Sequence, residues 1–139
     1  MDPMSGYLVP DRFDVTAYNG DHQASVIVRW EGENHDFTMT ADGPWGQVGG
    51  KGPDCFDALT RIREQLEPAG WFLGVNGARR DTWPSGSCRG AGGFLVCHLT
   101  PGVLPTREDL IQTFHEAPRE KLATVAEQIH FEQQWRASL

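Results

Sequence analysis

The chain has 139 residues, enough for one domain that buries most of its apolar surface without disulfides or metals. Hydrophobic residues make up 39% of the sequence and charged residues 22%, a globular composition that excludes a disordered chain. No apolar stretch of about eighteen residues could span a membrane, and the N-terminal sequence MDPMSGYLVPDRF lacks the basic and apolar regions of a signal peptide. We therefore expect a cytoplasmic protein without a membrane segment.

The net charge of −7 is unevenly distributed along the chain. Residues 1–57 contain ten acidic and three basic residues, whereas residues 58–139 contain nine of each. All of the net negative charge therefore lies in the N-terminal part. An acidic surface repels nucleic acid and steers association toward basic partners, although acidic residues also serve solubility. We expect a basic protein partner and no nucleic acid.

The first part of the chain predicts three antiparallel strands. Segments 13–19, 24–30 and 34–40 are rich in strand formers, and the sequences GDHQ and EGE between them suit hairpin turns. Residues 41–54 follow, and their glycines and prolines predict a loop. This loop does not match a phosphate-binding pattern, because Trp45 stands where that pattern needs glycine. We expect a flap whose Trp45 folds onto the core.

A helix is predicted over residues 54–70. Asp54 can cap its N-terminus, and Pro68 and Gly70 end it. Apolar side chains recur at three-to-four spacing and form the expected buried stripe, which comprises Cys55, Phe56, Leu59, Ile62 and Leu66. This pattern predicts a helix packed against an antiparallel sheet.

Two further strands and two further helices are predicted in the second part of the chain. The strands, at 71–76 and 93–99, can pair as a hairpin with the long connection 77–92 between them. The helices are predicted over 105–116, which opens with a capping box, and over 117–139.

The predicted order βββ-α-ββ-α-α indicates a single α+β domain over residues 1–139. We expect an antiparallel sheet of about five strands with the helices packed on one face. The C-terminal helix gives a core stripe made of Leu122, Val125, Ala126 and Ile129. Phe131 and Trp135 lie opposite that stripe, and large aromatic side chains are costly to expose. They are expected either to pack under another part of the chain or to form a second interface.

The connection 77–92 carries the candidate binding residues, which are Arg79, Arg80, Asp81, Trp83, Ser85 and Arg89. Arginine and tryptophan dominate the energetics of protein interfaces, so the segment is predicted to be an exposed recognition loop. A structural alternative remains open, in which Asp81 pairs with an arginine and Trp83 covers a sheet edge. The arginines beside Trp83 would also suit nucleic-acid stacking, but the acidic N-terminal part argues against that class.

The sequence favours binding over catalysis. Ser85 lacks the first glycine of a nucleophile elbow, because Trp83 occupies that position. Cys88 could be activated by Arg89, with His98 as a base. The histidines lack metal-ligand spacing and the three cysteines are an odd count, so we predict no metal, no cofactor and free thiols. The alternative is a ligand-binding or enzymatic domain with a pocket under the 77–92 segment.

The stretch LGVNGARRDTWPSG, with the preceding helix, resembles a set of small uncharacterised bacterial proteins over residues 54–99. In these a strand enters a Gly-Ala-Arg loop, followed by an aromatic-Pro-Ser-Gly turn and a methionine; this chain departs at Ser87 and Cys88. Some small acidic α+β proteins of this kind are similar to immunity proteins encoded beside bacterial toxins. The resemblance implies a non-catalytic immunity protein that occludes a basic toxin domain through its acidic face and the 77–92 segment. The oligomeric state stays open.

Overall fold

The computed structural model describes residues 9–139. The expectation that the N-terminal sequence is not a signal peptide therefore falls mostly on residues outside the described range. The strands are β1 (Arg12–Asn19), β2 (His22–Glu33), β3 (Asp36–Gly43), β4 (Gly46–Gly52), β5 (Phe72–Leu73), β6 (Thr82–Trp83), β7 (Leu95–His98) and β8 (Leu110–Gln112). The helices are α1 (Cys55–Leu66), α2 (Gly86–Gly90) and α3 (Val125–Ala137), with 3₁₀ turns η1 (Glu67–Ala69), η2 (Asn76–Ala78), η3 (Arg107–Asp109) and η4 (Arg119–Lys121). Over the described range, no helix is both long and apolar enough to cross a membrane.

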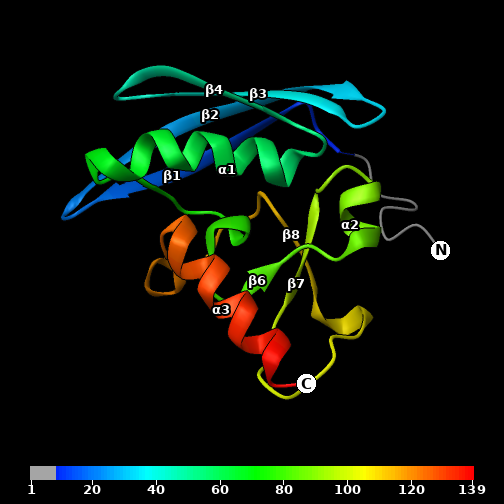
Figure 1. Cartoon of the computed structure of the whole chain (residues 1–139). Helices are drawn as coiled ribbons and strands as arrows, with labels where there is room; N and C mark the ends of the chain where they lie inside the picture. The colour runs from blue at the N-terminus through cyan, green and yellow to red at the C-terminus, as the bar shows by residue number, and fades with distance from the viewer. Residues whose placement is uncertain (1–8) are drawn as a thin grey trace.

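A curled antiparallel sheet of five strands, in the order β4-β3-β2-β1-β5, forms the upper layer of the molecule (Figure 1). Alternate residues point to its inner face because side chains alternate along a strand. The buried inner side chains are Phe13, Val15, Ala17, Val26, Val28, Phe37, Met39 and Ala41. The three predicted N-terminal strands are present, but the second turn lies at Asn34 and His35, whose φ angles of 51° and 64° are left-handed.

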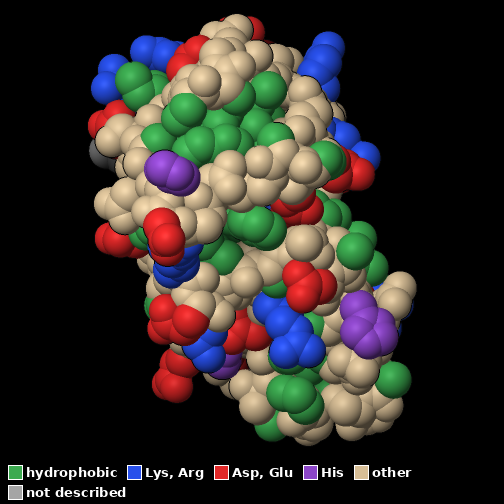
Figure 2. Space-filling view, turned by 90° about the vertical axis from the view of Figure 1, so that its left-hand side faces the viewer, with side chains coloured by type: hydrophobic (Ala, Val, Ile, Leu, Met, Phe, Trp, Pro, Cys, Tyr) green, Lys and Arg blue, Asp and Glu red, His purple; other side chains and the backbone are tan. Residues whose placement is uncertain are grey.

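The predicted loop 41–54 is wrong, because it contains strand β4. Helix α1 lies beneath this strand in Figure 1, and glycine permits the close approach. A Cβ at Gly50 would lie 2.4 Å from the carbonyl oxygen of Ala58 on α1. Trp45 packs on the core as expected, with its ring 5.5 Å from that of Trp71. Figure 2 views the molecule from the side of the β3–β4 turn and shows hydrophobic side chains gathered on the upper part of this surface.

Helix α1 packs on the inner face of the sheet, against β3 and β4. The Asp54 carboxylate accepts a hydrogen bond from the Asp57 backbone N–H at 2.8 Å and caps the helix. The predicted apolar stripe is confirmed, since all five side chains are at most 2% exposed. The helix and its cap therefore follow directly from the sequence pattern.

The predicted hairpin of 71–76 with 93–99 is wrong. Phe72 and Leu73 extend the large sheet by pairing with β1, whereas β7 is the centre of a second sheet, in the order β6-β7-β8. The predicted helix 105–116 is also wrong, although its capping box between Thr106 and Asp109 is present. That box opens only the 3₁₀ turn η3, and the chain then extends into β8 because its next residues pair with β7.

Helix α3 begins at Val125, not near residue 117, and Thr124 forms a capping box with Glu127. Its buried side chains are Gln128 and Glu132, and Ala126 and Ile129 of the expected core stripe are exposed. The helix contacts α1 and β6. The α+β class is thus confirmed, while the order of elements in the structure is ββββ-α-ββ-α-ββ-α.

We expect Leu59→Ala to lower the free energy of unfolding by at least about 2 kcal/mol, because it leaves a cavity between α1 and η2. Leu59 is 1% exposed, and a Cβ at Gly77 would lie 2.9 Å from its Cδ2. Urea denaturation measures the change. Arg61→Ala, on the exposed side of the same helix, is the control and should stay within about 0.5 kcal/mol. A similarly small loss for Leu59→Ala would mean that the stripe is not core.

Candidate functional site

A buried polar network fixes the start of the predicted recognition segment. Arg63 of α1 is 2% exposed, and its guanidinium donates to the carbonyls of Gly77 at 3.3 Å and Ala123 at 2.8 Å. It also donates to the side-chain oxygen of Gln128 on α3. The Gln128 amide in turn donates to the carbonyls of Gly77 and Thr82, both at 3.0 Å. The network joins α1, η2, β6 and α3.

Glu67 partners Arg63 in this network. Its Oε2 lies 3.3 Å from the Arg63 Nε, and its Oε1 accepts the backbone N–H of Val125, the first residue of α3, at 3.0 Å. Burial lowers the pKa of Arg63 to about 10, although the Glu67 carboxylate opposes this shift. The residues of this network were not predicted from the sequence. One signal in the sequence could have indicated Arg63. It lies four residues after Leu59, so it falls on the same face of the helix as the apolar stripe.

The first candidate binding residues pair with each other. The Arg79 guanidinium donates twice to the Asp81 carboxylate, at 2.8 and 2.9 Å, and the His98 Nε2 lies 2.9 Å from the same carboxylate. Burial raises the pKa of Asp81, but the hydrogen bonds and charge of Arg79, with His98, outweigh it, so this pKa lies below its ordinary value. The side chains of Arg79 and Asp81 are 15% and 16% exposed. The pairing predicted by the structural alternative is present.

We expect this carboxylate to make stability depend on acidity. Because the folded pKa of Asp81 is below the unfolded value of about 3.9, its contribution is present above that value and is lost as the pH falls through the folded pKa. Urea unfolding of the wild type and Asp81→Asn between about pH 5 and pH 2 checks this. The wild type should lose more stability than the variant over that range. If the free energies of unfolding of the two proteins changed with pH in parallel, the role assigned to Asp81 would be contradicted.

Arg80, the residue between this pair, is exposed. Its guanidinium lies over the Phe131 ring of α3, 5.2 Å from the centroid, where the cation is attracted to the ring face. Arg80, Asp81, His98, Lys121 and Phe131 contribute to the lining of a cleft of about 410 Å³. Glu120 also lines this cleft, so its two basic side chains, Arg80 and Lys121, are balanced by two carboxylates.

Trp83 is half-buried between α1 and α2. Its ring meets that of Phe56 edge to face with centroids 5.3 Å apart, and the Arg89 guanidinium lies 5.5 Å from the centroid of Trp83. Arg89 also donates to the Asp54 carboxylate at 3.1 Å, and that carboxylate caps α1. Trp83 and Arg89 therefore tie α2 to the N-terminus of α1.

Ser85 caps the short helix α2 by accepting the Cys88 backbone N–H at 3.1 Å. Cys88 and Cys97, from α2 and β7, line a cleft of about 460 Å³ together with Ser85. The cleft also includes Pro105, Thr106 and Arg107 from the turn before β8. Ser85 and Cys88 thus meet Arg107 at this surface, whereas Arg79 and Arg80 of the 77–92 segment do not line it.

The prediction that 77–92 is one exposed loop is wrong, because the segment contains part of η2, all of β6 and all of α2. Of the six candidate binding residues only Arg80 and Ser85 are exposed, and they line different clefts. The other four make the contacts described above. Phe131 and Trp135 pack against the core, and the Trp135 Nε1 donates to the Val103 carbonyl at 3.0 Å.

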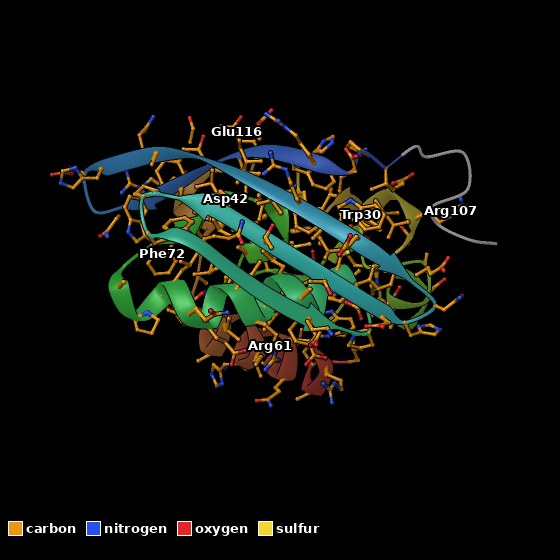
Figure 3. All side chains as sticks on the ribbon, turned by 90° about the horizontal axis from the view of Figure 1, so that it is seen from above. Trp30, Asp42, Arg61, Phe72, Arg107 and Glu116 are labelled. Carbon is orange, nitrogen blue, oxygen red and sulfur yellow. The ribbon has the colours of Figure 1, made fainter. Side chains whose placement is uncertain are left out.

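Exposed acidic side chains gather at one end of the five-stranded sheet. Asp11 and Glu31 line a cleft of about 380 Å³ there, and Glu33 faces Asp36 across the end of the β2–β3 hairpin. We call these four residues the acidic rim. In Figure 3 Trp30 marks this end of the sheet, and Phe72 marks the other. Within residues 9–139, no ion pair engages a rim carboxylate.

The basic residues nearest the rim have carboxylate partners of their own. Arg12 lies 3.2 Å from Asp14, and Arg29 lies 3.2 Å from Asp42. These pairs occupy the outer face of the sheet, which is seen from above in Figure 3. Both arginines also line the cleft beside Asp11 and Glu31, although neither forms an ion pair with a rim carboxylate.

Comparison with known proteins found no matching protein-family model and no matching curated protein.

Proposed function

We propose that this chain is a non-catalytic binding protein that docks a basic protein against its acidic rim and the adjoining outer face of the sheet. The observation that carries the proposal is the rim itself, with its exposed carboxylates and without ion pairs among the described residues. Such a surface accelerates the approach of a basic partner and gives specificity for it. In keeping with the resemblance noted above, the proposed role is that of an immunity protein that covers a bacterial toxin domain.

The geometry of the sheet supports this surface over the 77–92 segment. Trp83 and Arg89 already bind parts of the same chain, and releasing them to a partner would break the contacts between α1 and α2. The carboxylates of the rim, by contrast, are exposed and form no ion pair among the described residues, so a partner can reach them without breaking a contact of this kind. We therefore assign partner recognition to the rim.

The proposed location is the cytoplasm. Cys55, Cys88 and Cys97 are free and buried, as the odd count predicted, and reduced thiols are the rule in that compartment.

The test uses the full chain as bait in an extract of the cells that produce it. The wild type should retain a basic protein that elutes at about 1 M salt, where the Debye length falls to about 3 Å. The variant Glu31→Lys/Glu33→Lys/Asp36→Lys should not retain it. A matched variant, Glu64→Lys/Glu116→Lys/Glu120→Lys, makes the same charge change on the neutral part of the chain and should retain it.

Inhibition is then measured with the purified partner. Co-expression with the wild type should restore the growth of cells that produce the partner, and co-expression with the rim variant should not. Equal capture by the wild type and the rim variant would overturn the docking surface. Capture without growth rescue would overturn the immunity role and leave only a binding protein.

A further inference from the structure

Two cysteines far apart in the sequence share one cleft. Cys88 comes from the first turn of α2 and Cys97 from the middle of β7, and both line the cleft of about 460 Å³ described above. Their residues are 1% and 6% exposed, and this cleft is the opening that both of them line. Cys55, the third cysteine, is fully buried beneath the sheet and lines none of the clefts described above.

The two thiols are not equivalent. The hydrogen bond from the Cys97 thiol lowers the pKa of Cys88 to about 6, against the effect of burial, and Ser85 contributes further hydrogen bonds to Cys88. The same contact and burial raise the pKa of Cys97. Burial, with the nearby Asp54 carboxylate, raises the pKa of Cys55 to about 12. These opposite shifts favour the thiolate on Cys88 over one on Cys97 or Cys55.

We propose that Cys88 and Cys97 form a redox-active dithiol, in which Cys88 reacts with a hydroperoxide at the base of this cleft and Cys97 then forms a disulfide with it. The proposal rests on the shared cleft and the contact between the thiols, and it is independent of the proposed binding function.

Each step is balanced with the hydroperoxide as the oxidant. The Cys88 thiolate attacks one peroxide oxygen, an S–O bond forms, the O–O bond breaks, and the alkoxide or hydroxide that leaves takes up a proton. The Cys97 sulfur, as its thiolate, then attacks the Cys88 sulfur, the S–S bond forms and the S–O bond breaks. The departing hydroxide combines with the Cys97 proton as water. Two thiols and one hydroperoxide thus give one disulfide, one alcohol or water, and one further water.

The cleft has features that suit this chemistry. Ser85 caps α2 and places its hydroxyl beside Cys88, where it can stabilise the thiolate. Cys97 is held in β7 by its pairing with Trp83 on one side and Leu110 on the other. The resolving thiol is therefore on a fixed strand, and it lies next to the sulfur that it must attack.

The first test uses the reduced full chain and hydrogen peroxide. After treatment with one equivalent and blocking of the remaining thiols, digestion without reductant should give a peptide pair joined through Cys88 and Cys97 and lighter by two hydrogen atoms. Cys55 should be alkylated in the same sample. Before oxidation, native Cys88 should react with iodoacetamide at pH 7 more than about a hundredfold faster than Cys55, with a midpoint near pH 6.

Variants separate the two roles. In Cys97→Ala, Cys88 should stop at the sulfenic acid, which dimedone traps, whereas in Cys88→Ala the native chain should consume no peroxide. Cys55→Ala is the matched control and should form the disulfide at the wild-type rate. Should either cleft variant fail to fold, the mass and alkylation measurements on the wild type decide alone. Oxidation of Cys55 at the same rate, disulfides only between molecules, or an unreactive native Cys88 would each overturn the proposal.

Discussion

Replacing Arg63 with methionine is expected to lower the free energy of unfolding by about 3–5 kcal/mol, because it breaks a buried ion pair by removing one partner. The Glu67 carboxylate, 13% exposed, would keep its charge without its cation. The Ala123 carbonyl and the Gln128 side-chain oxygen would lose the donor that Arg63 supplies. Each unsatisfied buried polar group adds about 1–3 kcal/mol.

Urea denaturation measures this loss. Arg61→Met, on the exposed side of the same helix, is the matched control and should change stability by less than about 0.5 kcal/mol. The double variant Arg63→Met/Glu67→Gln should recover part of the loss, since the glutamine carries no charge and can still accept the Val125 N–H. A loss below about 1 kcal/mol for Arg63→Met would show that the polar network around Arg63 does not stabilise the start of the 77–92 segment.

Trp83→Ala is expected to lower the free energy of unfolding by about 3 kcal/mol, near the lower end of values for large aromatic side chains because Trp83 is only half-buried. The substitution removes the edge-to-face contact with Phe56 and one of the two rings over which Arg89 lies. Trp83→Phe should lose less, because a ring at this position keeps both kinds of contact. Thermal and urea unfolding of the two variants compare them. Unchanged stability in Trp83→Ala would contradict this structural role and would favour Trp83 as an anchor for a partner.

The parts of the fold that the sequence predicted are those in which local pattern and burial agree. Helix α1 has both a cap and an unbroken apolar stripe, and β1, β2 and β3 alternate in and out of the core. Strand β4 was missed because its glycines, which normally mark a loop, here allow α1 to approach. The capping box at Thr106 indicated a helix, but pairing of β8 with β7 is a long-range contact that local sequence does not reveal.

The candidate site was predicted in part for a similar reason. The structural alternative anticipated the Asp81 pair with an arginine, since the residues are close in sequence. Arg63 and Gln128 were missed because polar residues on helices usually face water, and their partners lie far away in sequence. Nothing in the local sequence links Cys97 to Cys88, and only the fold brings the two into the same cleft.

The affinity of three chains for the captured basic protein tests the central claim most directly. Wild type, Trp83→Ala and the rim variant Glu31→Lys/Glu33→Lys/Asp36→Lys are compared by titration calorimetry at a temperature where all three are folded. Binding through the acidic rim predicts that the rim variant binds at least about tenfold more weakly, because attraction to the partner becomes repulsion. Trp83→Ala should bind within about threefold of wild type, well below the loss of about 2 kcal/mol typical of an interface anchor. The opposite pattern, a large loss for Trp83→Ala and none for the rim variant, would contradict the account.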